Sequence, residues 1–261
     1  MARSLWRGSL SFGLVNVPVA LYSAVRDLDV HFHQLHADSH VQLEVKRVCQ
    51  KKGHEVPYEE IGYGYDLDGK QVVLAQEELD AAQPEKTRTI DIEEFVPLEE
   101  IDPVLFDSSY FLVPNAEGEG PARAYNLLLE VMDQEGRAAL GRFVLRTKEH
   151  LVAIRVRDGL LQATTMNFPD EVRNPKDLDL PTKKHAPSKK ELDNAVALVE
   201  ELSRDFDPKR YKDRHRERLL KIIERKRKGQ TIEAPAEPEA PKAVPDLLEA
   251  LERSLAEVRG S

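Results

Sequence analysis

Two short segments near the start of the chain alternate apolar and polar residues with the period of a β-strand. The apolar positions are Leu10, Phe12 and Leu14 in the first segment and Val17, Val19 and Leu21 in the second. A break near Asn16 separates the two phases, and Gly13 and Pro18 indicate a bulge or an edge strand. Because a half-buried strand needs other elements against its apolar side, these segments predict the first strands of a β-barrel.

Further strand patterns follow at short spacing along the chain. They cover residues 41–45, 87–95, 109–113, 140–145, 151–156 and 160–165. One long helical pattern interrupts them at residues 121–132, where Tyr125, Leu128 and Met132 share a stripe. Many short strands around one long helix argue against a βαβ sheet. They favour a mainly β fold, either a barrel or a sandwich.

From Ser188 onward the pattern is helical. Ser188 and Glu191 form a capping box at the start of a helix, and a second helix is expected to begin at Asp207 and Pro208. The apolar stripe of the first helix contains Leu192, Val196, Val199, Leu202 and Phe206. Residues 230–245 are rich in Pro, Ala and Glu, which predicts a solvated linker.

Several blocks of sequence occur in an order that is typical of one family. The first blocks are Trp6-Arg7-Gly8 and FGLVNVPV at residues 12–19. The later ones are FHQLH at 32–36, KRVC at 46–49, EFVP at 94–97, FDSSYFL at 106–112, FVLR at 143–146 and DFDPKRY at 205–211. Over roughly residues 3–225 the chain resembles the bacterial Ku proteins, which bind DNA ends in non-homologous end joining.

This resemblance implies a mainly β chain with a Ku-type β-barrel core, a bridge and a C-terminal α-helical arm. The expected divisions are a core at 1–187 with a bridge near 55–110, a dimerisation arm at 188–229, a linker at 230–245 and a ligase-docking helix at 246–261. Two copies are expected to form a ring-shaped homodimer that threads onto double-stranded DNA ends regardless of sequence. The ring would recruit and stimulate an ATP-dependent DNA ligase, and neither a cofactor nor catalytic residues are expected.

The formal net charge of −9 argues against DNA binding only when it is averaged over the chain. Residues 61–110 carry 3 basic and 13 acidic residues, whereas residues 181–230 carry 16 and 9. Binding to phosphates depends on the local field, so basic clusters are the candidates for DNA contacts. They contain Arg3, Arg7, Lys46, Arg47, Lys51, Lys52, Lys86, Arg88, Arg142, Arg146 and Lys148. Arg142 and Arg146 have the same parity in one predicted strand, which places them on one face.

A histidine-rich segment near the start of the chain raises the question of a metal site. The histidines at 31, 33, 36 and 40 precede Cys49 and invite a zinc interpretation. Many members of the resembled family carry a second cysteine three residues after the first, but this chain has Lys52 there. A cation in place of a thiolate argues against a closed zinc site, so no metal is expected.

Two other classes of function stay open. Carboxylates occur in adjacent pairs such as Glu93 and Glu94, and neighbouring residues of a strand point to opposite faces. They therefore do not converge as a two-metal nuclease requires, yet a metal-dependent nucleic-acid-processing enzyme is the alternative function. The third class is an interaction scaffold whose basic arm at 209–228 binds an acidic partner.

The helices after residue 188 are predicted to contact partners. The stripe that begins at Leu192 is expected to seal the homodimer, and its packing on the chain's own barrel is the rival arrangement. One side of the last helix carries Leu247, Leu248, Leu251, Leu255 and Val258. This side is expected to dock on the ligase, whereas the rival is a tail helix that packs back on the chain's own core.

The expected location is the cytoplasm, in association with the nucleoid. A single cysteine is typical of a reducing compartment. No apolar run approaches the roughly 20 residues needed to span a bilayer, and the first residues do not resemble a signal peptide. No membrane contact is therefore expected.

Overall fold

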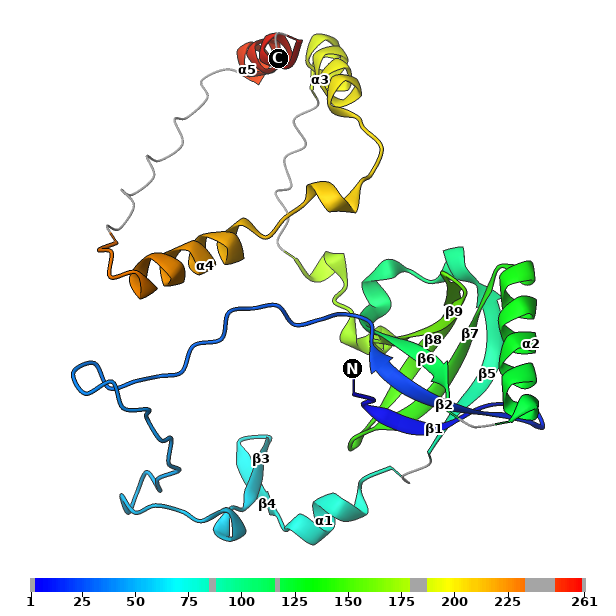
Figure 1. The fold of residues 1–261 in the computed structure, drawn as a ribbon, viewed down its shortest axis with the longest axis vertical. Helices are drawn as coiled ribbons and strands as arrows, with labels where there is room; N and C mark the ends of the chain where they lie inside the picture. Colours follow the sequence, from blue (N-terminus) through cyan, green and yellow to red (C-terminus); the bar gives the residue numbers. More distant parts are fainter. Residues whose placement is uncertain (1–2, 85–87, 116–117, 179–186, 233–246, 260–261) are drawn as a thin grey trace. The chain divides into compact units, whose positions relative to one another are not determined.

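The computed structural model describes residues 3–84, 88–115, 118–178, 187–232 and 247–259 (Figure 1). The chain forms two compact units. The first unit contains residues 1–27 and 33–177 and holds all the strands of the described residues. The second contains residues 28–32 and 178–261 and holds the last three helices. This division falls ten residues before the predicted end of the core at 187.

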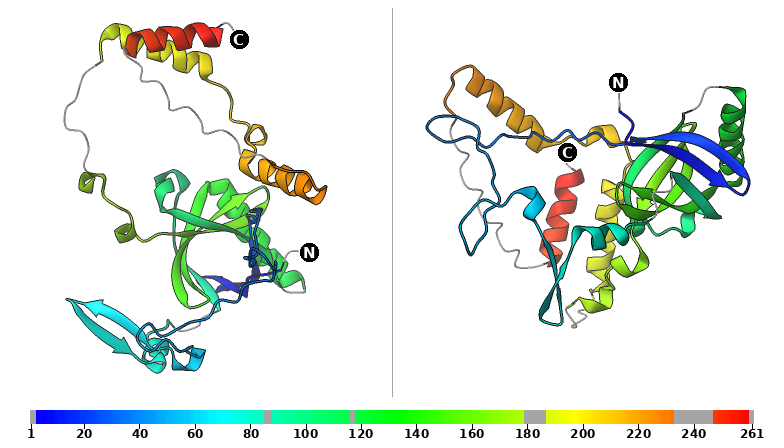
Figure 2. Two further views of the ribbon diagram at one scale, coloured as in Figure 1. Left: turned by 90° about the vertical axis from the view of Figure 1, so that its left-hand side faces the viewer. Right: turned by 90° about the horizontal axis from the view of Figure 1, so that it is seen from below.

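Seven strands of the first unit close into a barrel in the order β1-β2-β6-β9-β8-β7-β5. Their bounds are β1 Trp6–Phe12, β2 Val15–Ser23, β5 Thr89–Pro97, β6 Phe106–Pro114, β7 Arg137–Leu145, β8 Lys148–Arg157 and β9 Leu160–Met166. All neighbouring strands are antiparallel except β1 and β5, which are parallel and close the barrel. The predicted mainly β fold with a barrel core is confirmed, and Figure 2 shows the barrel from two further directions.

The hairpin of β1 and β2 follows the alternation of the sequence. Leu10 lies opposite Val17, and both are fully buried. Gly13 forms the turn with a positive φ of 55°, which favours glycine.

β2 pairs with β1 and, from Val19 onward, with β6, so it is a central strand and not the edge strand that Pro18 predicts. Pro18 itself lies before the first β6 pair, at a local edge. The Pro18 carbonyl points towards β6 and accepts from Asn115 N (3.0 Å), just beyond the end of the β2–β6 ladder. The N–H of an antiparallel residue points to the same side as its carbonyl. The N–H that proline lacks would therefore lie where the ladder has already ended, so Pro18 is tolerated.

The helix α2 (Glu119–Glu135) covers one end of the barrel and confirms the predicted helix at 121–132. It ends at Gly136, whose φ is 62°. Its buried residues Tyr125, Leu128 and Met132 join the main core cluster of the barrel. The Tyr125 hydroxyl donates to the Leu112 carbonyl (2.8 Å) and accepts from the Leu161 N–H (3.0 Å), so it links β6 to β9.

A long connection between β2 and β5 leaves the barrel after Ser23 and returns before Thr89. It contains the hairpin of β3 (Tyr63–Leu67) and β4 (Lys70–Leu74) and the short helix α1 (Gln76–Ala81). The strand predicted at 41–45 is wrong, because Val41 and Val45 are exposed and the segment forms one isolated bridge, Leu35 to Gln42. Alternation alone makes no strand where the described residues supply no neighbouring strand to pair with.

The second unit contains α3 (Lys189–Leu202), α4 (Arg214–Arg227) and α5 (Leu247–Arg259). Ser188 caps α3 by accepting from Glu191 N (3.3 Å), which confirms the predicted capping box. The predicted helix start at Asp207 is wrong: Asp207 caps only a 3₁₀ turn, Pro208–Arg210. Asp213 caps α4 instead, by accepting from Arg216 N (2.9 Å).

Candidate nucleic-acid interface

One end of the barrel collects several of the predicted DNA-binding cations. At this end β1, β5 and β8 begin and β7 ends, as their mutual registers require. It therefore carries Arg3 and Arg7 beside β1, Arg88 just before β5, and Arg146 and Lys148 around the turn between β7 and β8. The opposite end is covered by α2. Residues far apart in sequence thus form one basic end of the barrel.

A shallow depression of about 410 Å³ lies at the start of β1. Its lining contains Arg3, Arg7 and the aromatic rings of Trp6 and Tyr22. The Arg7 Nε donates to Ser4 Oγ (3.1 Å), which orients the guanidinium without neutralising it. Because neither arginine forms an ion pair within the described residues, both remain available to an anion.

Arg88 is held beside β1 by a close approach of backbones. The Ser9 N–H donates to the Arg88 carbonyl (2.8 Å). A Cβ on Gly8 would lie 2.2 Å from that carbonyl oxygen and 2.4 Å from the Trp6 ring, so only glycine fits there. Glycine at this position therefore lets the backbone of Arg88, just before β5, lie against β1, which carries Arg7.

Arg142 and Arg146 do not share a strand face, and this prediction is wrong. β7 ends at Leu145, and Arg146 lies in the turn with a φ of +63°. Arg142 is on the strand, where its guanidinium pairs with Glu93 (3.1 Å) and Glu149 (3.5 Å). The two carboxylates come from the neighbouring strands β5 and β8, so they largely cancel the charge that a phosphate would meet.

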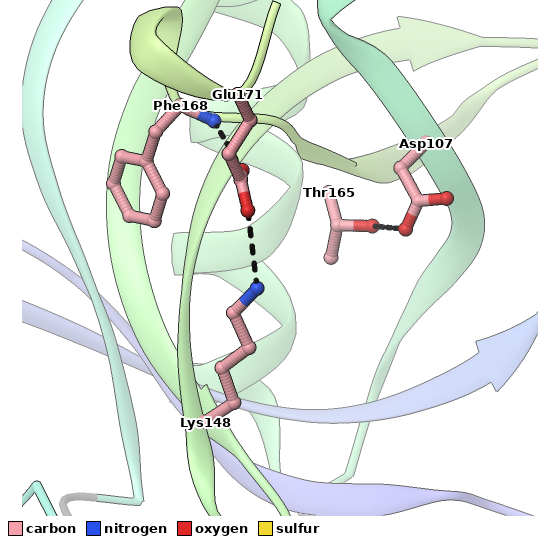
Figure 3. A network of polar contacts seen from close by, with 5 residues as sticks. All are labelled: Asp107, Lys148, Thr165, Phe168 and Glu171. Atoms are coloured by element: carbon pink, nitrogen blue, oxygen red, sulfur yellow. Dashed lines mark hydrogen bonds and ion pairs between the residues drawn. The ribbon is translucent and has the colours of Figure 1, made fainter. Parts of the chain in front are cut away.

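Lys148 belongs to a polar network at the same end of the barrel (Figure 3). Its Nζ lies 3.5 Å from a carboxylate oxygen of Glu171. The Phe168 N–H donates to the other oxygen (2.7 Å) and, together with Lys148, holds the pKa of Glu171 below its usual value. Burial, together with the charge of Lys148, lowers the pKa of His150, whose ring packs on Phe143 at 6.0 Å between centroids.

The cluster at Lys46–Lys52 lies on a small loop of the long connection. Lys46 Nζ pairs with Glu55 (2.9 Å), and the Arg47 guanidinium lies 5.8 Å from the centroid of the Tyr58 ring. Lys51 and Lys52 occupy the turn that the Cys49 carbonyl closes by accepting from Gly53 N (2.7 Å). Both lysines are exposed and form no ion pair with the described residues.

The predicted cations thus fall into two groups. Lys46, Arg142 and Lys148 are paired with carboxylates. The other group has no carboxylate partner among the described residues: Arg3, Arg7, Arg47, Lys51, Lys52, Arg88 and Arg146. Lys86 lies outside the described residues. Which of these residues touch DNA stays a prediction.

Two exposed cations near the basic end are absent from the sequence prediction. Arg26 follows the end of β2 by three residues, and Arg173 follows Glu171 by two. Each is a single charge among neutral or acidic neighbours, so no cluster marks it in the sequence. Both residues follow a strand that ends at the basic end of the barrel, and this position in the chain is the signal that could have identified them.

The histidine-rich segment shows no arrangement for a metal. Within the parts of the chain that the structure describes, no group of three or more His, Cys, Asp or Glu side chains is placed to hold an ion. His36 Nδ1 instead lies 3.0 Å from Ser39 Oγ, as a local turn contact. Cys49 is a free cysteine.

The apolar stripe of α3 is exposed along the helix. Leu192, Val196, Val199 and Leu202 expose 50–65% of their surface, and Phe206 beyond the helix exposes 80%. A different side of α3 contacts α5, so the two helices lie side by side (Figures 1 and 2). On α5 the half-buried residues are Leu248, Ala250, Leu251, Leu255 and Val258, whereas Leu247 is exposed. Ion pairs join Lys190 to Glu252 (2.9 Å) and Arg259 to Glu201 (3.0 Å).

None of the helices in the described ranges is both long and apolar enough to cross a membrane.

Comparison with known proteins identifies relatives of the whole chain. A family model described as the Ku70/Ku80 beta-barrel domain matches residues 11–194. The Non-homologous end joining protein Ku of Anaeromyxobacter sp. (strain K) is 46% identical over 261 residues, which cover 99% of this chain and 87% of that protein. Proteins of the same name from Heliobacterium modesticaldum and Mycobacterium tuberculosis (strain ATCC 25618 / H37Rv) are 41% and 37% identical. They match 99% and 97% of this chain, and 93% and 94% of their own length.

Proposed function

The chain belongs to the Ku family, and on that premise we propose that it binds the ends of double-stranded DNA in non-homologous end joining. It acts as a DNA-binding protein and not as an enzyme in this proposal. Two copies form a ring-shaped homodimer that accepts a DNA end irrespective of sequence. The ring then recruits and stimulates an ATP-dependent DNA ligase.

The observation that carries this proposal is the basic end of the barrel. Arg3, Arg7, Arg88 and Arg146 come to this end from three places in the chain, namely the start of β1, the residue before β5 and the turn after β7. None of them has a carboxylate partner in the described residues. Arginine binds phosphate oxygens through its planar, forked donors. Since phosphates are the same at every base pair, contacts of this kind position DNA without reading its sequence.

Competition between two forms of DNA tests the need for an end. Labelled linear duplex is bound in a gel shift and competed with linear or closed circular DNA at equal base-pair mass. The linear competitor is expected to displace the probe and the closed circle to compete poorly, because a preformed ring has no path onto a circle. Equal competition by both would leave ordinary electrostatic binding and remove the ring.

The homodimer is proposed to use the exposed stripe of α3. Four large apolar side chains on one exposed helix face are typical of an interface. Changing Val196 and Val199 to Glu is expected to convert dimers to monomers in light scattering. The same change at the exposed Val104, in the first unit, is the control and is expected to leave the dimer intact. A dimer that survives the double change would exclude this stripe as the interface.

Ligase recruitment is proposed to use α5. Its apolar side has the three- and four-residue spacing of a helix that binds in a groove. In this structure that side lies half-buried on α3, so a ligase must either displace α5 or read its exposed side, where Leu247 lies. Deleting residues 246–261 is expected to preserve end binding and to abolish stimulation of the ligase. Full stimulation without these residues would disprove the assignment.

A further inference from the structure

The strongest basic feature of the chain belongs to the second unit and contains none of the barrel cations described above. Residues 209–228 carry 11 Lys and Arg against 3 Asp and Glu. They contain the helix α4, whose residues other than Arg216 and Leu219 are exposed.

The cations of α4 are not spread evenly around the helix. With 3.6 residues per turn, Arg214, Arg218, Lys221 and Arg225 fall within an arc of about 60°. We call these four residues the basic stripe. Successive members are about 4.5–6 Å apart along the axis, and the stripe extends about 16 Å. Leu219 and Ile223 lie on the opposite side, which leaves the basic stripe free when that side packs.

The cations of the basic stripe are not ion-paired within the described residues. The nearest ion pair on the helix joins Lys228 to Glu224 (2.9 Å). Glu217 and Glu224 lie three or four residues from stripe members, but neither forms an ion pair with them. Within the stripe, successive members are three or four residues apart, and each such like-charge pair destabilises a helix by about 0.2–0.5 kcal/mol. An extended anion along this side would turn that repulsion into attraction.

We propose that the basic stripe of α4 binds the phosphate backbone of duplex DNA, as a second contact besides the barrel end. This proposal rests on the proposed function and names a further site for the same ligand. A stripe of about 16 Å equals the rise of roughly five base pairs along the duplex axis. Three of its four residues are arginines, which grip phosphate oxygens bidentately. α4 carries no aromatic ring except His215, so it has no platform of rings for stacking bases and contacts the backbone alone.

The test compares two triple variants with the same change in net charge. The stripe variant replaces Arg214, Arg218 and Lys221 by Gln. The matched control replaces Arg216, Lys226 and Arg227 by Gln, on the other side of the same helix. Gln is a good helix former, and far-UV circular dichroism of both variants verifies that helix content is unchanged. Affinity for linear duplex is then measured over a range of salt concentrations.

Each phosphate contact contributes about −0.9 to the slope of log affinity against log salt, so the stripe variant is expected to lose about 2.7 of that slope. The control is expected to lose less than about 0.9. A third variant carries Arg214→Lys and Arg218→Lys and keeps the native Lys221, so that all three positions are charged again. Its slope of log affinity against log salt is expected to equal that of the wild type. Equal losses in both triple variants would show a net-charge effect and overturn the proposal.

Two further outcomes separate this proposal from the proposed function. If the wild-type protein binds DNA ends and the stripe variant binds them with the wild-type slope, the basic stripe is not a DNA site and the acidic protein partner takes its place. If the wild-type protein does not bind linear duplex at all, the DNA-binding function itself fails, and the basic stripe proposal with it.

Discussion

Replacing Tyr125 by Phe tests how α2 holds the barrel closed. The Tyr125 side chain is 3% exposed, and its hydroxyl lies between β6 and β9. It donates to the Leu112 carbonyl at 2.8 Å and accepts from the Leu161 N–H at 3.0 Å. Leu112 and Leu161 face each other in the ladder, so the hydroxyl bridges two strands at the point where the pairing ends.

The expected loss of stability follows from these two contacts. Removing the hydroxyl leaves a buried N–H and a buried carbonyl without their partner, and each such group costs about 1–3 kcal/mol. Phe is the less polar ring to bury, which offsets part of this cost. We expect the barrel to lose about 2–3 kcal/mol in its free energy of unfolding.

The assay uses the single tryptophan of the chain. Trp6 packs edge-on against Phe143 inside the first unit, with ring centroids 5.8 Å apart, so its fluorescence follows unfolding of the barrel. In urea the midpoint is expected to fall by about 1–1.5 M at an unchanged slope of about 2 kcal/mol/M. Tyr65→Phe, at an exposed position of the β3–β4 hairpin, is the matched control and is expected to change stability by less than about 0.5 kcal/mol. A Tyr125→Phe change as small as the control would refute the role of the hydroxyl.

The geometry leads to four further predictions. Arg146→Gln is expected to weaken end binding more than Arg142→Gln, because Glu93 and Glu149 already neutralise Arg142. Titration of labelled duplex at low salt measures the affinity of both variants, and equal losses of affinity would contradict this prediction. Lys148→Gln is expected to raise the pKa of His150 only partway towards its ordinary value, because burial is a larger cause of the lowered pKa than the charge of Lys148. NMR titration of the imidazole measures this pKa, and an unchanged value would show that Lys148 does not lower it. Since the folded His150 resists protonation, the barrel is also expected to lose stability as the pH falls through the ordinary value of about 6.5, and His150→Gln should remove that component in urea titrations. Gly8→Ala is expected to destabilise the barrel by about 1–3 kcal/mol, since its Cβ meets the backbone of Arg88; a Trp6-monitored midpoint equal to the wild type would disprove this.

Much of the secondary structure is determined by the sequence alone. Alternation at Leu10, Val17 and Val19 predicts β1 and β2, and all three residues are buried in the barrel. The Ser188 and Glu191 capping box predicts the start of α3. These features are local: the period of the side chains and the hydrogen bonds of a helix end involve residues a few positions apart.

The limits of the sequence lie where distant residues meet. The same alternation at Val41 and Val45 produces no strand, because pairing needs a neighbour that no local pattern supplies. Arg142 and Arg146 do not share a face despite their equal parity, because the strand ends at Leu145. No spacing rule places Glu93 of β5 and Glu149 of β8 beside Arg142.

For the candidate site, the sequence determined which residues are charged and which family they resemble. The tertiary structure alone decided which charges remain uncompensated. Closure of the barrel through the parallel pair β1 and β5 brings Arg7 beside Arg88, and the antiparallel neighbours cancel Arg142. The basic stripe of α4 shows the opposite case, since its spacing is visible in the sequence. Only the bounds of α4 and the lack of ion pairs show that the charges of the stripe are available to a ligand. The physical reason is that a ligand responds to the summed field of a charge and its neighbours, and an ion-paired charge contributes little to that field.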